Sequence, residues 1–145
     1  MPEVKCGFVG ADLLTWFGPT LKVDIGFDPD CVPDSGAIPI PGITGTQAIV
    51  DTGAHECCID SMLASQLNLP IVDRSGFSGA HGPGEVNIHL AQIRVPELGF
   101  TVFGRFAGVH LAAGGSHNNA LIGRTFRQFF TVKYDGRSGE VTIST

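Results

Sequence analysis

The chain has 145 residues, of which 43% are hydrophobic and 16% are charged, and its formal net charge is -5 at pH 7. This length suits one domain with a full hydrophobic core, and the negative charge argues against nucleic acid or an anionic membrane as the main partner. Twenty glycines and nine prolines indicate many turns and short elements, which favours a β-rich fold.

The first segment, 1–19, is expected to be a lead-in to a domain at 20–145. It lacks the charged start, continuous apolar core and small-residue cleavage site of a signal peptide, and the chain has no apolar run of about 18 residues. We therefore expect a cytoplasmic protein with reduced cysteines. The segment could be an extra edge strand, a dimer contact or a disordered lead-in, and Trp16 and Phe17 favour packing.

The domain begins with an alternating apolar and polar stretch at 20–27, which predicts a strand. Residues 28–45 hold four of the prolines and are expected to form a loop. The short apolar stretch at 46–50 predicts a buried strand. The apolar spacing at 59–69 predicts a helix, with Asp60 or Ser61 as its N-cap and Pro70 after its end.

The second half of the chain is expected to be mostly strands. The glycine-rich segment 75–86 leads into an alternating strand at 86–95, which indicates a hairpin. A further strand is expected at 100–111, and a loop at 114–119. Residues 120–130 predict a strand followed by a short helix with Arg124 or Thr125 near its cap. The end of the chain, 131–143, has the pattern of a β-hairpin around Asp-Gly and Ser-Gly. The architecture is therefore mostly β, with two short helices.

One apolar strand ends on a carboxylate, in the triplet Asp51-Thr52-Gly53. Two carboxylates held about 3 Å apart share one proton, so that one can act as a base on water and the other as an acid on a carbonyl. This chemistry needs an Asp at the end of a buried strand, a small hydroxyl to hold the loop, and a glycine that lets backbones approach closely. The triplet meets these demands, although on its own it is also common turn chemistry.

Three blocks in chain order carry a family resemblance: A-I-V-D-T-G-A at 48–54, the glycine-rich segment at 75–86, and A-L-I-G-R at 120–124. Together they resemble the retropepsin-like aspartic proteases, the single-lobe family that includes retroviral proteases. The resemblance implies a mostly β acid-protease barrel or sandwich with two short helices and a flap hairpin. It also implies an aspartic endopeptidase that acts on a peptide or protein substrate as a symmetric homodimer, with no metal and no cofactor.

The resemblance assigns roles to particular residues. Asp51 would be catalytic, with one copy from each subunit. The active-site loop would continue through Thr52, Gly53 and Ala54. Substrate would be bound by His55 and by the flap residues Gly79, Ala80, His81 and Gly82. The catalytic loop would be supported by Ile122, Gly123 and Arg124. Retroviral members often have an acidic residue after D-T-G-A that holds the arginine, whereas this chain has His55 and then Glu56, so a pair between Arg124 and Glu56 stays open.

Three alternatives compete with this interpretation. Asp34, in a second D-S-G-A segment, is too close to Asp51 in sequence to mark a second lobe, and its flanks are those of a loop. A zinc site at His55, Cys57 and Cys58 lacks the usual spacing, and buried thiols are the better interpretation of the cysteines. A non-catalytic dimeric module that binds peptides on the same fold is the alternative function.

Overall fold

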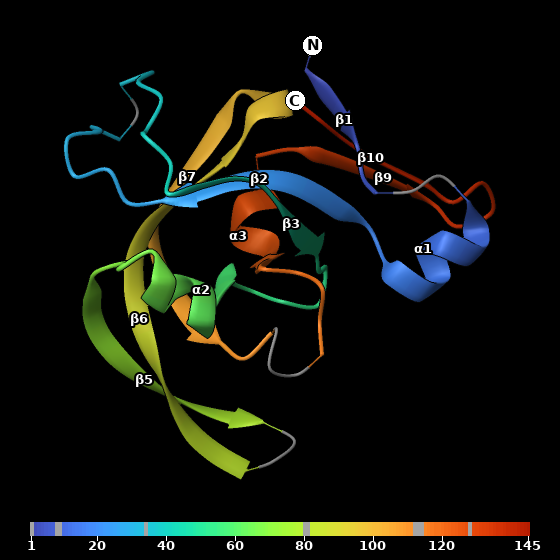
Figure 1. The fold of residues 1–145 in the computed structure, drawn as a ribbon. Coiled ribbons are helices and arrows are strands. Elements are labelled where there is room, and N and C mark those ends of the chain that lie inside the picture. Colours follow the sequence, from blue (N-terminus) through green and yellow to red (C-terminus); the bar gives the residue numbers. More distant parts are fainter. Residues whose placement is uncertain (1, 8–9, 34, 80–81, 112–114, 128) are drawn as a thin grey trace.

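The computed structural model describes residues 2–7, 10–33, 35–79, 82–111, 115–127 and 129–145 (Figure 1). Its larger sheet contains, in spatial order, β2 (Thr20–Gly26), β3 (Ile43–Val50), β8 (Ala120–Ile122), β4 (Cys58–Asp60), β7 (Phe100–Val109), β6 (Gly82–Val95) and β5 (Ile71–Gly79). Because β2 also pairs with β6, the sheet curls and closes on itself. The mostly β prediction is confirmed.

The order of strands around β8 determines where the loop after β3 must run. Strand β3 pairs with β8 in parallel, with Val50 opposite Ile122, and β4 pairs with the other edge of β8 in antiparallel fashion. Strands β3 and β4, which follow each other in the chain, therefore lie on either side of β8. The connection at 51–57 has to cross the end of β8, directly beside the residues that follow Ile122.

The smaller sheet joins the two ends of the chain. It contains β1 (Glu3–Lys5), β10 (Glu140–Ser144) and β9 (Thr131–Asp135), with β10 in the middle. In Figure 1 it lies at the top of the view, whereas the hairpin of β5 and β6 projects at the bottom. The expected C-terminal hairpin is confirmed, and the lead-in segment contributes β1 as an edge strand.

The lead-in segment also contains a short helix, α1 (Ala11–Phe17), which the sequence did not predict. Leu14 is its buried residue, whereas Trp16 is 83% exposed, so Trp16 does not pack on its own chain and its packing in a dimer contact stays a prediction. Residues two apart on a helix point in different directions, and a helix of two turns can turn only one side toward the sheet.

Helix α2 (Ser61–Gln66) is shorter than predicted. Asp60 is its N-cap, as expected, and accepts a hydrogen bond from the Leu63 N–H at 3.2 Å. The expected start at Ile59 is wrong, because Ile59 belongs to β4 and is fully buried between β7 and β8. Met62 is 55% exposed rather than part of a buried helix face.

The remaining short elements are η1 (Pro96–Leu98) and α3 (Arg124–Arg127). The core between the sheets is aliphatic and is extended by a group of phenylalanines. Phe126, the buried residue of α3, stacks on Phe130 with ring centroids 4.9 Å apart and meets the edge of Phe100 at 5.5 Å. Helix α3 is thus fixed to the core directly after β8. No helix in the described part of the chain is long and apolar enough to cross a membrane.

Candidate active site

Asp51 stands at the buried end of β3, where its backbone continues the parallel pairing with β8. Its N–H donates to the carbonyl of Ile122 at 3.0 Å. The preceding residue, Val50, is buried, and Asp51 itself is half-buried. The strand therefore carries a carboxylate from the core to the surface at a defined point, because the β-branched and apolar residues before it hold the strand in place.

The loop after Asp51 turns back on its carboxylate. The Gly53 N–H donates to Asp51 Oδ1 at 2.8 Å, and the Ala54 N–H donates to the Asp51 carbonyl at 3.3 Å. Thr52 and Gly53 are exposed. A carboxylate oxygen that accepts a backbone N–H is fixed in direction, so this turn orients the Asp51 side chain.

The segment after β8 holds the loop from the other side. Arg124 N–H donates to the Ala54 carbonyl at 2.9 Å, and Thr125 N–H donates to the His55 carbonyl at 3.0 Å. The first N–H groups of a helix have no partner within the helix, and here the loop carbonyls satisfy them. Ile122, Gly123 and Arg124 therefore lie against the loop of Asp51, and their role as support for a catalytic loop stays a prediction.

Gly123 allows this contact because it has no side chain. A Cβ at this position would lie 2.3 Å from the Glu56 carbonyl oxygen and 3.0 Å from that of Ala54. Its N–H donates to Cys57 Sγ at 3.3 Å in a buried contact. Cys57 therefore takes part in the support of the loop, a role that the sequence does not mark, since a buried cysteine usually acts as a small apolar residue.

The side chain of Arg124 binds the loop backbone and not Glu56. Its Nη1 donates to the Thr52 carbonyl at 3.0 Å. The Glu56 carboxylate instead lies 3.9 Å from His55 Nδ1, with both side chains well exposed. Arg124 is therefore fastened to the backbone of the loop rather than to the acidic residue beside it.

Burial and several neighbouring charges, among them that of Asp51, raise the pKa of Cys58. Burial raises the pKa of the Cys58 thiol to about 11, and the neighbouring Cys57, Glu56 and Asp51 add to the shift. The thiol is therefore neutral at pH 7. Within the described residues, no group of three or more His, Cys, Asp or Glu side chains could hold a metal ion.

The other predicted site residues lie on the hairpin. Gly79 and Gly82 face each other as the last pair between β5 and β6. Ala80 and His81, which were expected at the tip, lie outside the described residues, as does Asp34. The role of the hairpin as a flap stays a prediction.

No family model and no curated protein matches the sequence. A retropepsin-like aspartic protease from Rickettsia conorii matches the structure with a TM-score of 0.58 and 12% identity, over 97% of this chain and 89% of that one. The EIAV protease, solved with the inhibitor HBY-793, matches with a TM-score of 0.48 and 18% identity, over 77% and 86%. This chain has the retropepsin-like fold.

Proposed function

We propose that the chain is an aspartic endopeptidase that works as a homodimer, in which the Asp51 carboxylates of two copies share one proton. The observation that supports this proposal most directly is the position of Asp51 and the set of hydrogen bonds that hold its loop. Asp51 follows a buried strand, its Oδ1 accepts the Gly53 N–H, and its loop is held by the residues at 122–125. This support fixes the position and direction of the Asp51 carboxylate, as a shared-proton dyad requires.

A second copy is required because the sequence contains the D-T-G triplet once. The buried carboxylate that follows it, Asp60, serves the fold. Its two oxygens accept the N–H groups of Leu63 at 3.2 Å and Leu111 at 3.1 Å, and its side chain begins α2. Asp60 is therefore a structural cap, and the partner of Asp51 would be the Asp51 of another subunit.

The proposed reaction uses the two carboxylates in opposite protonation states. The ionised carboxylate takes a proton from a water molecule, whose oxygen attacks the peptide carbonyl carbon. The protonated carboxylate gives its proton to the carbonyl oxygen. When the resulting gem-diol collapses, one of its hydroxyl groups returns a proton to the ionised carboxylate, the protonated carboxylate gives its proton to the leaving nitrogen, and the C–N bond breaks. The products are a carboxylic acid and an amine, and the dyad returns to its starting charge.

The substrate would be a peptide that passes over the Asp51 loop. Thr52, Gly53 and Ala54 would border it, and His55, exposed at the end of the loop, would contact its side chains. The hairpin of β5 and β6 would close over the bound peptide, which would exclude water from the reacting bond.

The test is cleavage of denatured casein by Asp51→Asn, compared with Asp30→Asn as the matched control. Asp30 lies in an exposed turn of the loop after β2, so its substitution removes the same charge elsewhere. We expect the wild type and Asp30→Asn to cleave. We expect Asp51→Asn to lose cleavage while keeping its circular dichroism spectrum and its mass by light scattering. Cleavage by Asp51→Asn at the wild-type rate would refute the proposal. A wild-type chain that binds peptides without cleaving them would instead be the non-catalytic module.

A further inference from the structure

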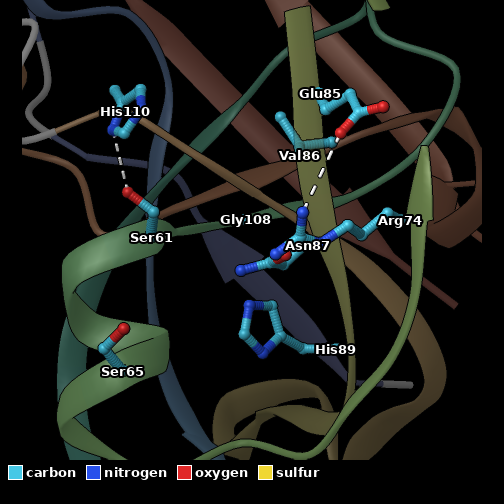
Figure 2. Close-up of a pocket in the computed structure, with 9 residues that line it drawn as sticks. All are labelled: Ser61, Ser65, Arg74, Glu85, Val86, Asn87, His89, Gly108 and His110. Atoms are coloured by element: carbon cyan, nitrogen blue, oxygen red, sulfur yellow. Dashed lines mark hydrogen bonds and ion pairs between the residues drawn. The ribbon is translucent and has the colours of Figure 1, made fainter. Parts of the chain in front are cut away.

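A polar pocket of about 400 Å³ lies at the base of the hairpin (Figure 2). Its walls come from α2, from both strands of the hairpin and from the end of β7. In Figure 2, Ser61, Ser65 and His110 lie on one side of the pocket, and Arg74 and Glu85 lie on the other. The residues of the Asp51 loop are not part of its lining, so the pocket is a second site.

His89 gives the pocket a buried acceptor. Its side chain is only 4% exposed, and its Nδ1 lies 3.1 Å from the carbonyl of Leu69. A carbonyl can only accept, so Nδ1 carries the hydrogen, and in the neutral ring Nε2 is left with a lone pair. Nε2 faces the backbone of Gly108, where a Cβ would lie 3.1 Å away. Among the described residues, Nε2 has no hydrogen-bond partner, which is uncommon for a buried polar atom and indicates a site for a donor.

One wall of the pocket carries one positive and one negative side chain, Arg74 and Glu85, which form a weak ion pair. Arg74 Nη1 and Glu85 Oε2 are 3.9 Å apart, and both side chains are 72% exposed. A pair at this distance in contact with water contributes little to stability, so either group can exchange its partner for a ligand. On the opposite wall, Ser61 Oγ lies 3.0 Å from His110 Nδ1. The pocket thus offers one cation, one anion and hydroxyl groups.

We propose that this pocket binds a small zwitterion of the amino-acid class, either a free amino acid or a dipeptide. The ligand carboxylate would be bound by Arg74, and the hydroxyls of Ser61 and Ser65, on the opposite wall, would face the other end of the ligand. The ligand ammonium would donate to Glu85 and to Nε2 of His89. A simple anion would meet Glu85, and a simple cation would meet Arg74, so a ligand with both charges fits the wall best. The volume is in the range of pockets that hold small molecules.

Binding at this pocket does not depend on peptide cleavage. The occupant would touch Arg74 and Glu85 on the hairpin and Ser61 on α2, and would therefore connect the base of the hairpin to the body of the molecule. A chain that binds zwitterions here but cleaves no peptide would have this site without the proposed activity.

The test is calorimetric titration with glycine, L-glutamine and diglycine, with acetate and methylamine as probes that carry one charge each. We expect saturable binding of at least one zwitterion below about 10 mM, and at least tenfold weaker binding of acetate and methylamine. Arg74→Gln and Glu85→Gln should each weaken binding about tenfold or more, because each removes a charged partner. Both residues are exposed, so the fold should persist. Arg105→Gln, an exposed arginine on β7 outside the pocket, is the matched control and should bind normally.

A second measurement addresses His89 itself. The ¹⁵N resonance of Nε2, followed by long-range proton–nitrogen correlation, should move toward the hydrogen-bonded range when the zwitterion binds. An unmoved resonance with full occupancy would overturn the assignment of His89. Absence of saturable binding by any of the three zwitterions, equal binding of acetate, or unchanged affinity in Arg74→Gln would overturn the proposal.

Discussion

The guanidinium of Arg124 donates a hydrogen bond to the carbonyl of Thr52 at 3.0 Å, so the residue that begins α3 also fastens the loop that carries Asp51. Replacing it by glutamine removes the charge and shortens the reach. We predict that Arg124→Gln lowers kcat for casein cleavage by about tenfold or more, because a misplaced carboxylate loses the geometry on which a shared proton depends.

The stability of this variant should change little. The bond is exposed, and one hydrogen bond contributes about 0.5–1.5 kcal/mol net, so the free energy of unfolding in urea should fall by no more than that. Arg137→Gln, in the turn between β9 and β10, is the control and should keep both activity and stability. Equal activity of the two variants would show that the Arg124 side chain does not position the loop.

Gly123 gives a prediction about stability. In Gly123→Ala, the new Cβ would lie 2.3 Å from the Glu56 carbonyl oxygen, so the backbone of the loop or of α3 must move. Overpacking of this kind costs about 1–3 kcal/mol. In Gly104→Ala, on β7, the new Cβ would meet nothing within 4 Å, and the free energy of unfolding should stay within about 0.5 kcal/mol of the wild type. Urea unfolding of both variants is the measurement, and equal losses would contradict the steric argument.

The proposed dyad gives a prediction about pH. Cleavage requires one protonated and one ionised carboxylate, so the plot of kcat/KM against pH should be bell-shaped, with two apparent pKa values that belong to the pair. The rate should fall on the acid side when both carboxylates are protonated and on the alkaline side when both are ionised. A rate that stays level into strongly alkaline solution would be incompatible with a shared proton.

The loop of Asp51 could be predicted from sequence because its determinants are local. An apolar strand, a triplet with a hydroxyl and a glycine, and a second strand ending in Gly123 each leave a short pattern. The N-cap at Asp60 was also visible, because N-caps follow side-chain chemistry. The predicted strand at 20–27 matches β2, because the alternation of apolar and polar residues is also a local pattern.

Features that depend on distant partners could not be predicted in this way. The stretch around Ile59 has helical spacing, and only pairing with β7 and β8 makes it a strand. The hydrogen bond between Gly123 and Cys57 joins residues that are far apart in the chain. The pocket at His89 is assembled from α2, β5, β6 and β7, and no single segment carries a pattern that would reveal it.

The cysteines should differ in their reaction with iodoacetamide at pH 8. Burial raises the pKa of Cys6 to about 12 and that of Cys58 to about 11, from 9.0 in the unfolded chain. Cys58 should therefore hold roughly a hundredfold less thiolate than in urea, and Cys6 still less. Cys31 is partly exposed in the loop after β2 and should be modified first. Peptide mass spectrometry over time gives the order, and early labelling of Cys6 would contradict its burial.

The same shifts affect stability at alkaline pH. A thiol whose pKa is higher in the folded state favours folding below the unfolded value of 9.0, and this contribution is lost as the pH rises toward the folded value. The urea midpoint should therefore decline above pH 9. The variants Cys6→Ala and Cys58→Ala, compared with wild type at each pH, would show a smaller decline.

Asp135 should stabilise the turn between β9 and β10 through its charge. The N–H groups of Ser138 and Arg137 donate to its carboxylate and lower its pKa below the ordinary value. This contribution is complete above the ordinary pKa of an aspartate and is lost as the pH falls through the lower folded value. Asp135→Asn should lower the urea midpoint slightly at pH 7, and the difference from wild type should disappear in acid. A difference that is the same at every pH would mean that the charge has no part in it.

Strand β6 has a mechanical consequence for the hairpin. Its inner part is clamped on both edges, since it pairs with β7 from Ile88 onward and with β2 at 92–94, whereas 82–87 pair with β5 alone. The hairpin is therefore a cantilever: it is fixed to the sheet at one end, and its other end projects from the sheet. Any load at its far end produces its largest bending moment where the clamp begins, at Ile88 and His89. Bending of the described part of the hairpin is thus resisted mainly where pairing with β7 begins, beside the pocket.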